Sequence, residues 1–111
     1  MHIPSQLTNE EKQFNYDYAS IADQTINARS LHQLFKSHET HIITGHMHYN
    51  LNMEFSENIM EHNTASACGT WWQIPECLDG TPRGYAVYKV SQNKVEWYYK
   101  GAEYDHNYQM R

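Results

Sequence analysis

The sequence lacks long hydrophobic runs, an excess of basic residues and a cysteine-rich segment. No stretch approaches the roughly 18 apolar residues of a membrane-spanning helix, so we expect no membrane partner. Lys and Arg number 8 against 13 Asp and Glu, which gives a formal net charge of -5. An acidic chain has no electrostatic surface for nucleic acid, and we expect no nucleic-acid partner.

Cysteine is also scarce, since only Cys68 and Cys77 are present. Two cysteines cannot form a disulfide framework, and these two lack the C-x-x-C spacing of a structural zinc site. The sequence leaves open a bridge between them in an oxidising compartment or free thiols with Cys68 buried. The opening Met1-His2-Ile3-Pro4 lacks the basic and apolar regions of a signal peptide, and the cellular location is not determined.

The residues that are present suffice for one folded domain. A chain of 111 residues with 40% hydrophobic and 14% aromatic side chains has the length and the apolar content of a single domain with a core. It also contains 8 histidines against 5 glycines and 3 prolines. This excess is the first indication of metal chemistry, because neutral imidazole is the commonest metal ligand in proteins.

The first half of the chain predicts one helix and one strand. Residues 25–37 place apolar side chains at helical spacing, with Thr25 or Asn27 available to cap the first amides. Residues 40–44 form a short β-branched run that ends at Gly45, which predicts a buried strand. Residues 5–23 read as loop, with at most a helical turn over residues 8–14.

The second half predicts strands and turns. We expect strands over residues 58–62 and 65–72, a turn at Asp79-Gly80-Thr81-Pro82, and a hairpin formed by residues 85–90 and 95–99 around a four-residue turn, 91–94. Alternation along the hairpin predicts two aromatic faces: Tyr85, Val87, Val95, Trp97 and Tyr99 on one, and Tyr88, Val90, Tyr98, Glu96 and Lys100 on the other. The predicted fold class is α/β, a mixed β-sheet covered by one main helix and followed by a C-terminal β-hairpin.

The sharpest local motif is Gly45-His46-Met47-His48. Two histidines at positions i and i+2 of an extended backbone project to the same side, and the end of a strand is where α/β folds collect ligands. A shared metal centre is one interpretation. The other is that two surface histidines lie near each other by chance.

Other candidates carry less information. His62 lies on a probable strand, where a packed or surface histidine is favoured over a metal ligand. Trp71-Trp72 is a possible stacking platform for a sugar or base, but neighbouring strand residues face opposite ways, so we expect one in the core and one exposed. His32, His38, His41 and His106 receive no role.

Two motifs together resemble a known family. Thr44-Gly45-His46-Met47-His48-Tyr49-Asn50 resembles the Gly-His-x-His block of calcineurin-like metallophosphoesterases, and Met1-His2-Ile3-Pro4 is similar to their His-x-Pro segment. The run from Glu61-His62-Asn63 through Ala67-Cys68-Gly69-Thr70-Trp71-Trp72 to the C-terminus resembles the bacterial branch that carries an extra C-terminal domain. The resemblance covers nearly the whole chain.

The resemblance implies a fold and a site. Residues 1–111 are expected to be the C-terminal portion of the catalytic domain, a partial sandwich of the metallophosphoesterase type. It further implies that His2 and His46 bind one divalent ion and His48 a second. Two such ions clamp a phosphate ester during in-line displacement. Manganese, iron, zinc and nickel are not distinguished.

The resemblance also shows what is missing. The Asp-x-His, Gly-Asp-x-x-Asp and Gly-Asn-His blocks of the family do not occur in this sequence. We therefore expect a truncated domain that supplies part of a binuclear site and is inactive alone. The alternative is a non-catalytic binding or assembly module with an aromatic surface. Uncovered strand edges predict a homo-oligomer under either hypothesis.

Overall fold

The computed structural model describes residues 1–5, 25–105 and 107. The chain divides into two compact units, one formed by Met1–Met47 and Leu51–Asn63, the other by His48–Asn50 and Thr64–Arg111. Within the described residues, no helix has the length and apolar character needed to cross a membrane. The turn predicted over residues 8–14 and the position of His106 lie outside the described residues.

The first unit contains the predicted helix, α2, which spans Ala28–Phe35. It is shorter than the predicted range, and the predicted side-chain cap is wrong. Asn27 occupies the cap position without a side-chain hydrogen bond. The Thr25 hydroxyl donates instead to the Pro4 carbonyl at 3.1 Å, so this side chain ties the helix entrance to the opening segment rather than to the helix.

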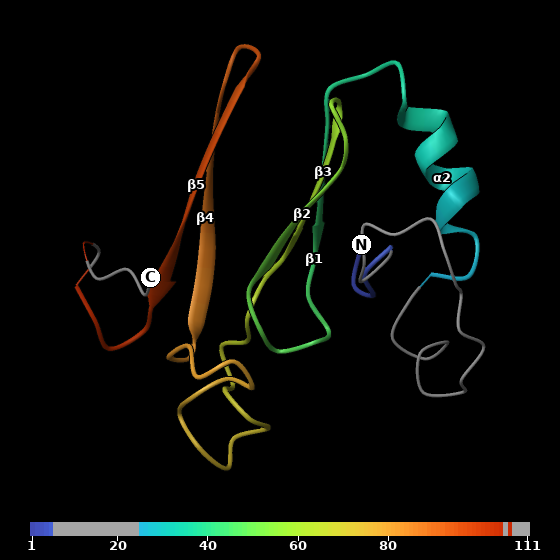
Figure 1. The fold of residues 1–111 in the computed structure, drawn as a ribbon. Helices are drawn as coiled ribbons and strands as arrows, with labels where there is room; N and C mark the ends of the chain where they lie inside the picture. Colours follow the sequence, from blue (N-terminus) through green and yellow to red (C-terminus); the bar gives the residue numbers. More distant parts are fainter. Residues whose placement is uncertain (6–24, 106, 108–111) are drawn as a thin grey trace. The chain divides into compact units, whose positions relative to one another are not determined.

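A mixed three-stranded sheet completes the first unit (Figure 1). It contains β1 (Thr40–Thr44), β2 (Leu51–Ser56) and β3 (Ile59–Asn63), in the order β1-β3-β2. Strand β1 pairs with β3 in parallel, and β2 pairs with β3 antiparallel. The predicted strands 40–44 and 58–62 are confirmed to within one residue, and β2 was missed although Leu-Asn-Met-Glu-Phe-Ser alternates in the manner of a half-buried strand.

The α/β class is confirmed for the described residues, which contain a mixed sheet and one short helix, whereas the two-sheet sandwich stays a prediction. Helix α2 contacts the sheet through His32, whose ring centroid lies 4.5 Å from that of Phe55. Among the described residues of this unit, the buried hydrophobic side chains are few: Ala28, Ile42, Met53 and Ile59. Much of the remaining interior is polar and belongs to β3, the central strand.

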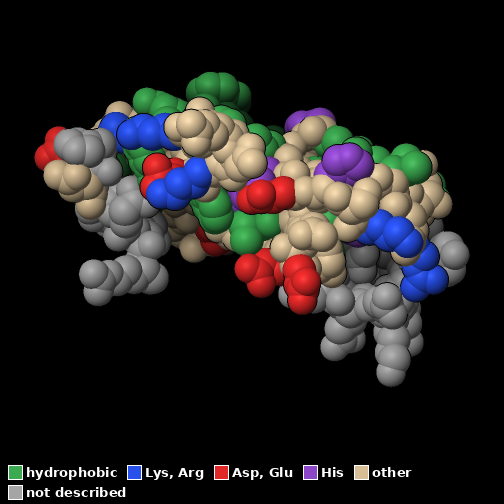
Figure 2. Space-filling model, turned by 90° about the horizontal axis from the view of Figure 1, so that it is seen from above, with side chains coloured by type: hydrophobic (Ala, Val, Ile, Leu, Met, Phe, Trp, Pro, Cys, Tyr) green, Lys and Arg blue, Asp and Glu red, His purple; other side chains and the backbone are tan. Residues whose placement is uncertain are grey.

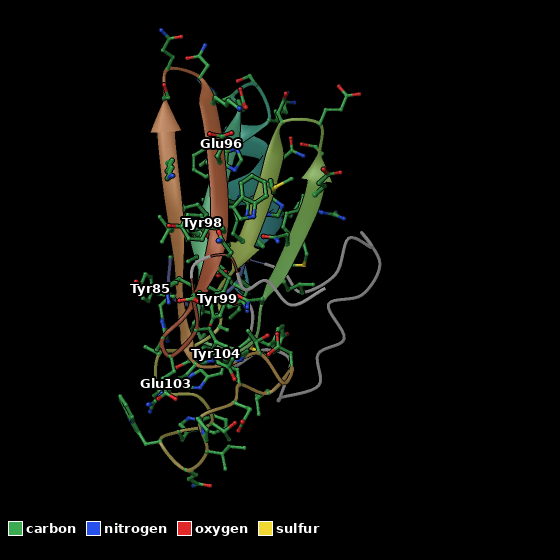
Figure 3. All side chains as sticks on the ribbon, turned by 90° about the vertical axis from the view of Figure 1, so that its left-hand side faces the viewer. Tyr85, Glu96, Tyr98, Tyr99, Glu103 and Tyr104 are labelled. Carbon is green, nitrogen blue, oxygen red and sulfur yellow. The ribbon has the colours of Figure 1, made fainter. Side chains whose placement is uncertain are left out.

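The second unit contains the predicted hairpin, formed by β4 (Gly84–Ser91) and β5 (Lys94–Gly101). Figure 3 shows its aromatic side chains, with Tyr85 on β4 and Tyr98 and Tyr99 on β5. The turn has two residues, Gln92 and Asn93, because Ser91 and Lys94 are paired. The hairpin is confirmed, and its predicted four-residue turn is wrong.

The predicted composition of the two hairpin faces is also wrong. The register pairs Tyr88 with Trp97 and Val87 with Tyr98, and directly opposed residues share a face. Thus Trp97 lies with Tyr88, whereas the sequence had placed it with Tyr85 and Val87. The alternation of side chains along each strand is as predicted. The pairing of residues across the turn differs, because it depends on the register between the two strands.

Residues 65–72 do not form the predicted strand. They form turns, and their pairing is limited to an isolated bridge from Thr70 to Ile74. Gly69 has a φ of 58°, and a Cβ there would lie 2.4 Å from the Ile74 carbonyl oxygen. The chain therefore turns back tightly at a position that requires glycine.

The predicted turn at Asp79-Gly80-Thr81-Pro82 is confirmed. The Asp79 Oδ1 atom accepts from the Thr81 amide at 3.0 Å, and Gly80 has a φ of 78°. Both cysteines are free thiols; Cys77 is buried and Cys68 is partly exposed.

The hairpin turn generates a stability prediction. Gln92 has a φ of 52°, in the left-handed region that costs a side chain roughly 1 kcal/mol and that glycine adopts readily. We expect Gln92→Gly to raise the free energy of unfolding by up to about 1 kcal/mol, less the entropy that glycine adds to the unfolded chain. Urea unfolding checks this, with Asn93→Gly as the control that gives no gain.

Candidate metal-binding histidines

His2 and His46 lie together in the first unit. The Gly45 amide donates to the His2 carbonyl at 3.0 Å, so the opening segment runs beside the end of β1, directly before His46. The His46 Nδ1 atom lies 3.2 Å from His2 Nε2. The two ring centroids are 5.1 Å apart with the planes at 81°. Side chains 44 positions apart in the sequence thus direct ring nitrogens at each other.

This separation is compatible with a shared ion. Zinc–imidazole bonds of about 2.0–2.1 Å at a tetrahedral angle place two nitrogens roughly 3.3 Å apart. The same separation allows a hydrogen bond in which one neutral ring donates and the other accepts. The pair therefore meets the distance requirement for two ligands of one metal.

A buried carboxylate holds the segment that carries His2. The Ser5 amide donates to Glu61 Oε1 at 3.0 Å, and the Ser5 hydroxyl donates to Glu61 Oε2. The Thr44 hydroxyl donates to Glu61 at 3.2 Å, and His32 Nε2 lies 2.8 Å from Ser5 Oγ. Burial raises the pKa of Glu61, and the hydrogen bonds from Ser5 and Thr44 oppose that rise. The network joins the opening segment, α2, β1 and β3.

His48 belongs to the second unit, whereas His46 belongs to the first. The predicted extended backbone at this motif is wrong, because His46 and His48 have φ values of 68° and 54°. Alternation along a strand therefore does not direct their side chains. The His48 carbonyl accepts from the Leu78 amide at 3.1 Å, which attaches this residue to the loop of the second unit.

The His48 ring makes a polar contact typical of a metal ligand. Its Nδ1 lies 3.1 Å from the Gly69 carbonyl oxygen, and since a carbonyl only accepts, Nδ1 carries the proton. The other nitrogen, Nε2, then has its lone pair available. Metal-bound histidines commonly donate their second ring N–H to such a carbonyl. Cys68 Sγ lies 3.9 Å from the same Nδ1.

In the part of the chain that the structure describes, no three or more His, Cys, Asp or Glu side chains are grouped to hold a metal. His2 and His46 form a pair, and His48 has its own surroundings. The predicted centre of all three stays a prediction. Figure 2 shows acidic and histidine side chains exposed on the face seen from above.

His62 is packed, as the sequence favoured. It is 1% exposed on β3, donates from Nδ1 to Asn52 Oδ1 at 2.7 Å, and its Nε2 lies 2.8 Å from His41 Nδ1. Burial, with a smaller contribution from His41, lowers its pKa to about 4. Both ring nitrogens are engaged, so this histidine connects β1, β3 and β2 in its neutral form.

Comparison with known proteins adds one finding. Residues 61–111 match the family described as the C terminal of calcineurin-like phosphoesterase. The match begins beside the boundary of the two units, where Asn63 ends the first and Thr64 continues the second. No curated protein and no solved structure shows a significant match. The resemblance predicted from the sequence is confirmed over these residues.

The buried His62 generates a pH prediction. Its pKa of about 4 in the folded chain lies below the ordinary 6.5, so between these values the unfolded chain binds more protons. The free energy of unfolding should therefore fall as pH drops from 6.5 to 4, by at most about 1.4 kcal/mol per pH unit. We expect His62→Gln to flatten this slope in chemical unfolding, and His38→Gln, at an exposed position, to leave it unchanged.

Proposed function

We propose that the chain is part of a metal-dependent phosphoesterase, because residues 61–111 match the C-terminal region of calcineurin-like phosphoesterases. His2, His46 and His48 contribute to its divalent-metal centre. The observation that carries the proposal is the 3.2 Å separation of the His2 and His46 ring nitrogens. Bound divalent ions would polarise the phosphoryl oxygens of a phosphate ester.

His2 and His46 would hold one ion and His48, through Nε2, the other. Imidazole nitrogens suit zinc, iron and nickel; manganese is common to such centres by the family resemblance. The Gly69 carbonyl, 3.1 Å from His48 Nδ1, would keep that ring in the tautomer that exposes Nε2 as a ligand. Glu61 and Ser5 would keep His2 near His46, because they tie its segment to β3.

The histidines present are too few for catalysis by this chain alone. Zinc in proteins takes three or four protein ligands, and among the described residues no third ligand joins the His2–His46 pair. The Asp and Asn ligand blocks of the family are not part of this sequence. We propose that the chain binds a divalent ion weakly and does not hydrolyse esters without a complementary segment.

A second candidate function is an assembly module that does not require metal. The observation that favours it is the exposure of Trp71, Trp72, Ile74 and Leu78 in the second unit, since contiguous exposed apolar residues commonly mark interaction sites. The β4–β5 sheet is two-stranded in the described structure, and free strand edges recruit other strands. We propose self-association into a homo-oligomer under either function.

Metal binding separates the two functions. If His2 and His46 share an ion, added zinc or nickel should raise the melting temperature, because a ligand that binds only the folded state stabilises it by about 2.7 kcal/mol at 100 times its dissociation constant. His46→Ala should abolish this shift. His38→Ala, which removes an exposed histidine hydrogen-bonded to Ser37, should keep it. An equal shift in both variants would contradict the shared site.

Hydrolysis tests whether the half-site is inactive. With manganese, nickel or zinc and a chromogenic phosphate ester, we expect the rate of the isolated chain to stay at the level of buffer with metal. The physical reason is that two ions need more ligands than three imidazoles provide. Robust turnover that His48→Ala removes would show that the chain is a complete enzyme.

A further inference from the structure

Two neighbouring tryptophans, Trp71 and Trp72, lie in the loop that contacts His48, a candidate metal-binding residue. Trp71 is 57% exposed and Trp72 is 78% exposed, so the prediction that one of them lies in the core is wrong. Both have left-handed backbones, with φ values of 46° and 65°. Such values are rare for bulky residues and persist only where the surroundings enforce them.

The surroundings here are a dense set of backbone hydrogen bonds. The Trp71 amide donates to the Gly69 carbonyl at 3.1 Å, and the Trp72 amide donates to the Cys68 carbonyl at 2.9 Å. The Thr70 hydroxyl donates to the Glu76 carbonyl at 2.9 Å. The tryptophan loop, residues 68–74, therefore presents its two indoles from a fixed backbone, which reduces the entropy lost when a ligand contacts them.

The tryptophan loop is continuous with the candidate metal site. The His48 and Trp71 ring centroids are 4.9 Å apart with their planes at 30°. The carbonyl that accepts from His48 Nδ1 belongs to Gly69 of the same loop. A phosphate ester bound at His48 would therefore carry its alcohol portion beside Trp71, with Trp72 as the next residue of the loop.

We infer that Trp71 and Trp72 form a stacking platform for an aromatic ring in the alcohol portion of the substrate, a nucleobase or an aryl group. This inference rests on the proposed phosphoesterase function and adds the substrate class. Indole faces stack on flat aromatic rings with little dependence on ring substituents. The platform selects for an aromatic alcohol, while the phosphoryl group is recognised by the metal centre.

The test measures ligand binding to the whole chain without metal. In a Trp97→Phe background, only Trp71 and Trp72 emit, since the chain contains 3 tryptophans. With excitation at the red edge, we expect adenosine and adenosine monophosphate to quench this emission saturably. Glycerol phosphate and inorganic phosphate should leave it unchanged. Trp71→Ala should weaken adenosine binding at least five-fold, whereas Trp71→Phe should largely retain it.

Val90→Ala is the matched control, because Val90 is an exposed apolar residue of β4, outside the tryptophan loop, and its replacement should leave adenosine affinity unchanged. If Trp97→Phe does not fold, the indole N–H resonances of the natural chain provide the same readout. Absence of a tryptophan response to millimolar adenosine overturns the platform, whatever the metal tests show. A blue shift of the tryptophan emission that grows with protein concentration in the absence of adenosine also overturns it, because this shift would show that another copy of the chain covers the indoles.

Discussion

The structure of the first unit depends on a carboxylate that is removed from water. Glu61 on the central strand β3 is 0% exposed, and burying an ionised carboxylate is costly unless hydrogen bonds replace its hydration. Ser5 supplies two donors and Thr44 a third. Because Ser5 lies in the opening segment and Thr44 ends β1, the hydrogen bonds that Glu61 accepts bring distant parts of the chain to the same central strand.

The hydrogen bonds to Glu61 also position two candidate metal-binding histidines. His2 lies three residues before Ser5, and His46 lies two residues after Thr44, so both histidines flank groups that Glu61 holds. The interior around Glu61 is polar: His62 and Asn63 are buried next to it on the same strand. Polar interiors of this kind stabilise a fold only when every member has its partner, and they then specify one arrangement.

In the second unit, backbone hydrogen bonds hold the loop beside His48 in place. Residues 68–74 have little apolar interior, and their shape comes from turns closed by amide and hydroxyl donors. This places His48 against a carbonyl and an indole, and it leaves Trp71 and Trp72 exposed. A fixed loop that displays aromatic surface beside a histidine is suited to holding a ligand, and the matched family region begins close to this unit.

Local patterns in the sequence determined helix α2, strands β1 and β3, the Asp79-Gly80 turn and the existence of the hairpin. Each depends on the spacing of apolar residues or on turn-forming residues within a few positions. The same local pattern gives a wrong prediction for residues 65–72, where the alternation is strand-like but Gly69 has a left-handed backbone and the chain turns back to pair Thr70 with Ile74. It also failed for the hairpin faces, since alternation along one strand does not give the register across two.

The sequence by itself also indicated His2, His46 and His48 as candidate ligands and a resemblance to calcineurin-like phosphoesterases, because those depend on residue types and order. Only the tertiary structure decided that His2 and His46 meet, that His48 donates to Gly69, and that both tryptophans are exposed. The meeting of His2 with His46 and of His48 with Gly69 depends on hydrogen bonds between residues 21 to 56 positions apart. The free energy of such bonds depends on burial and geometry, which no local window of sequence contains.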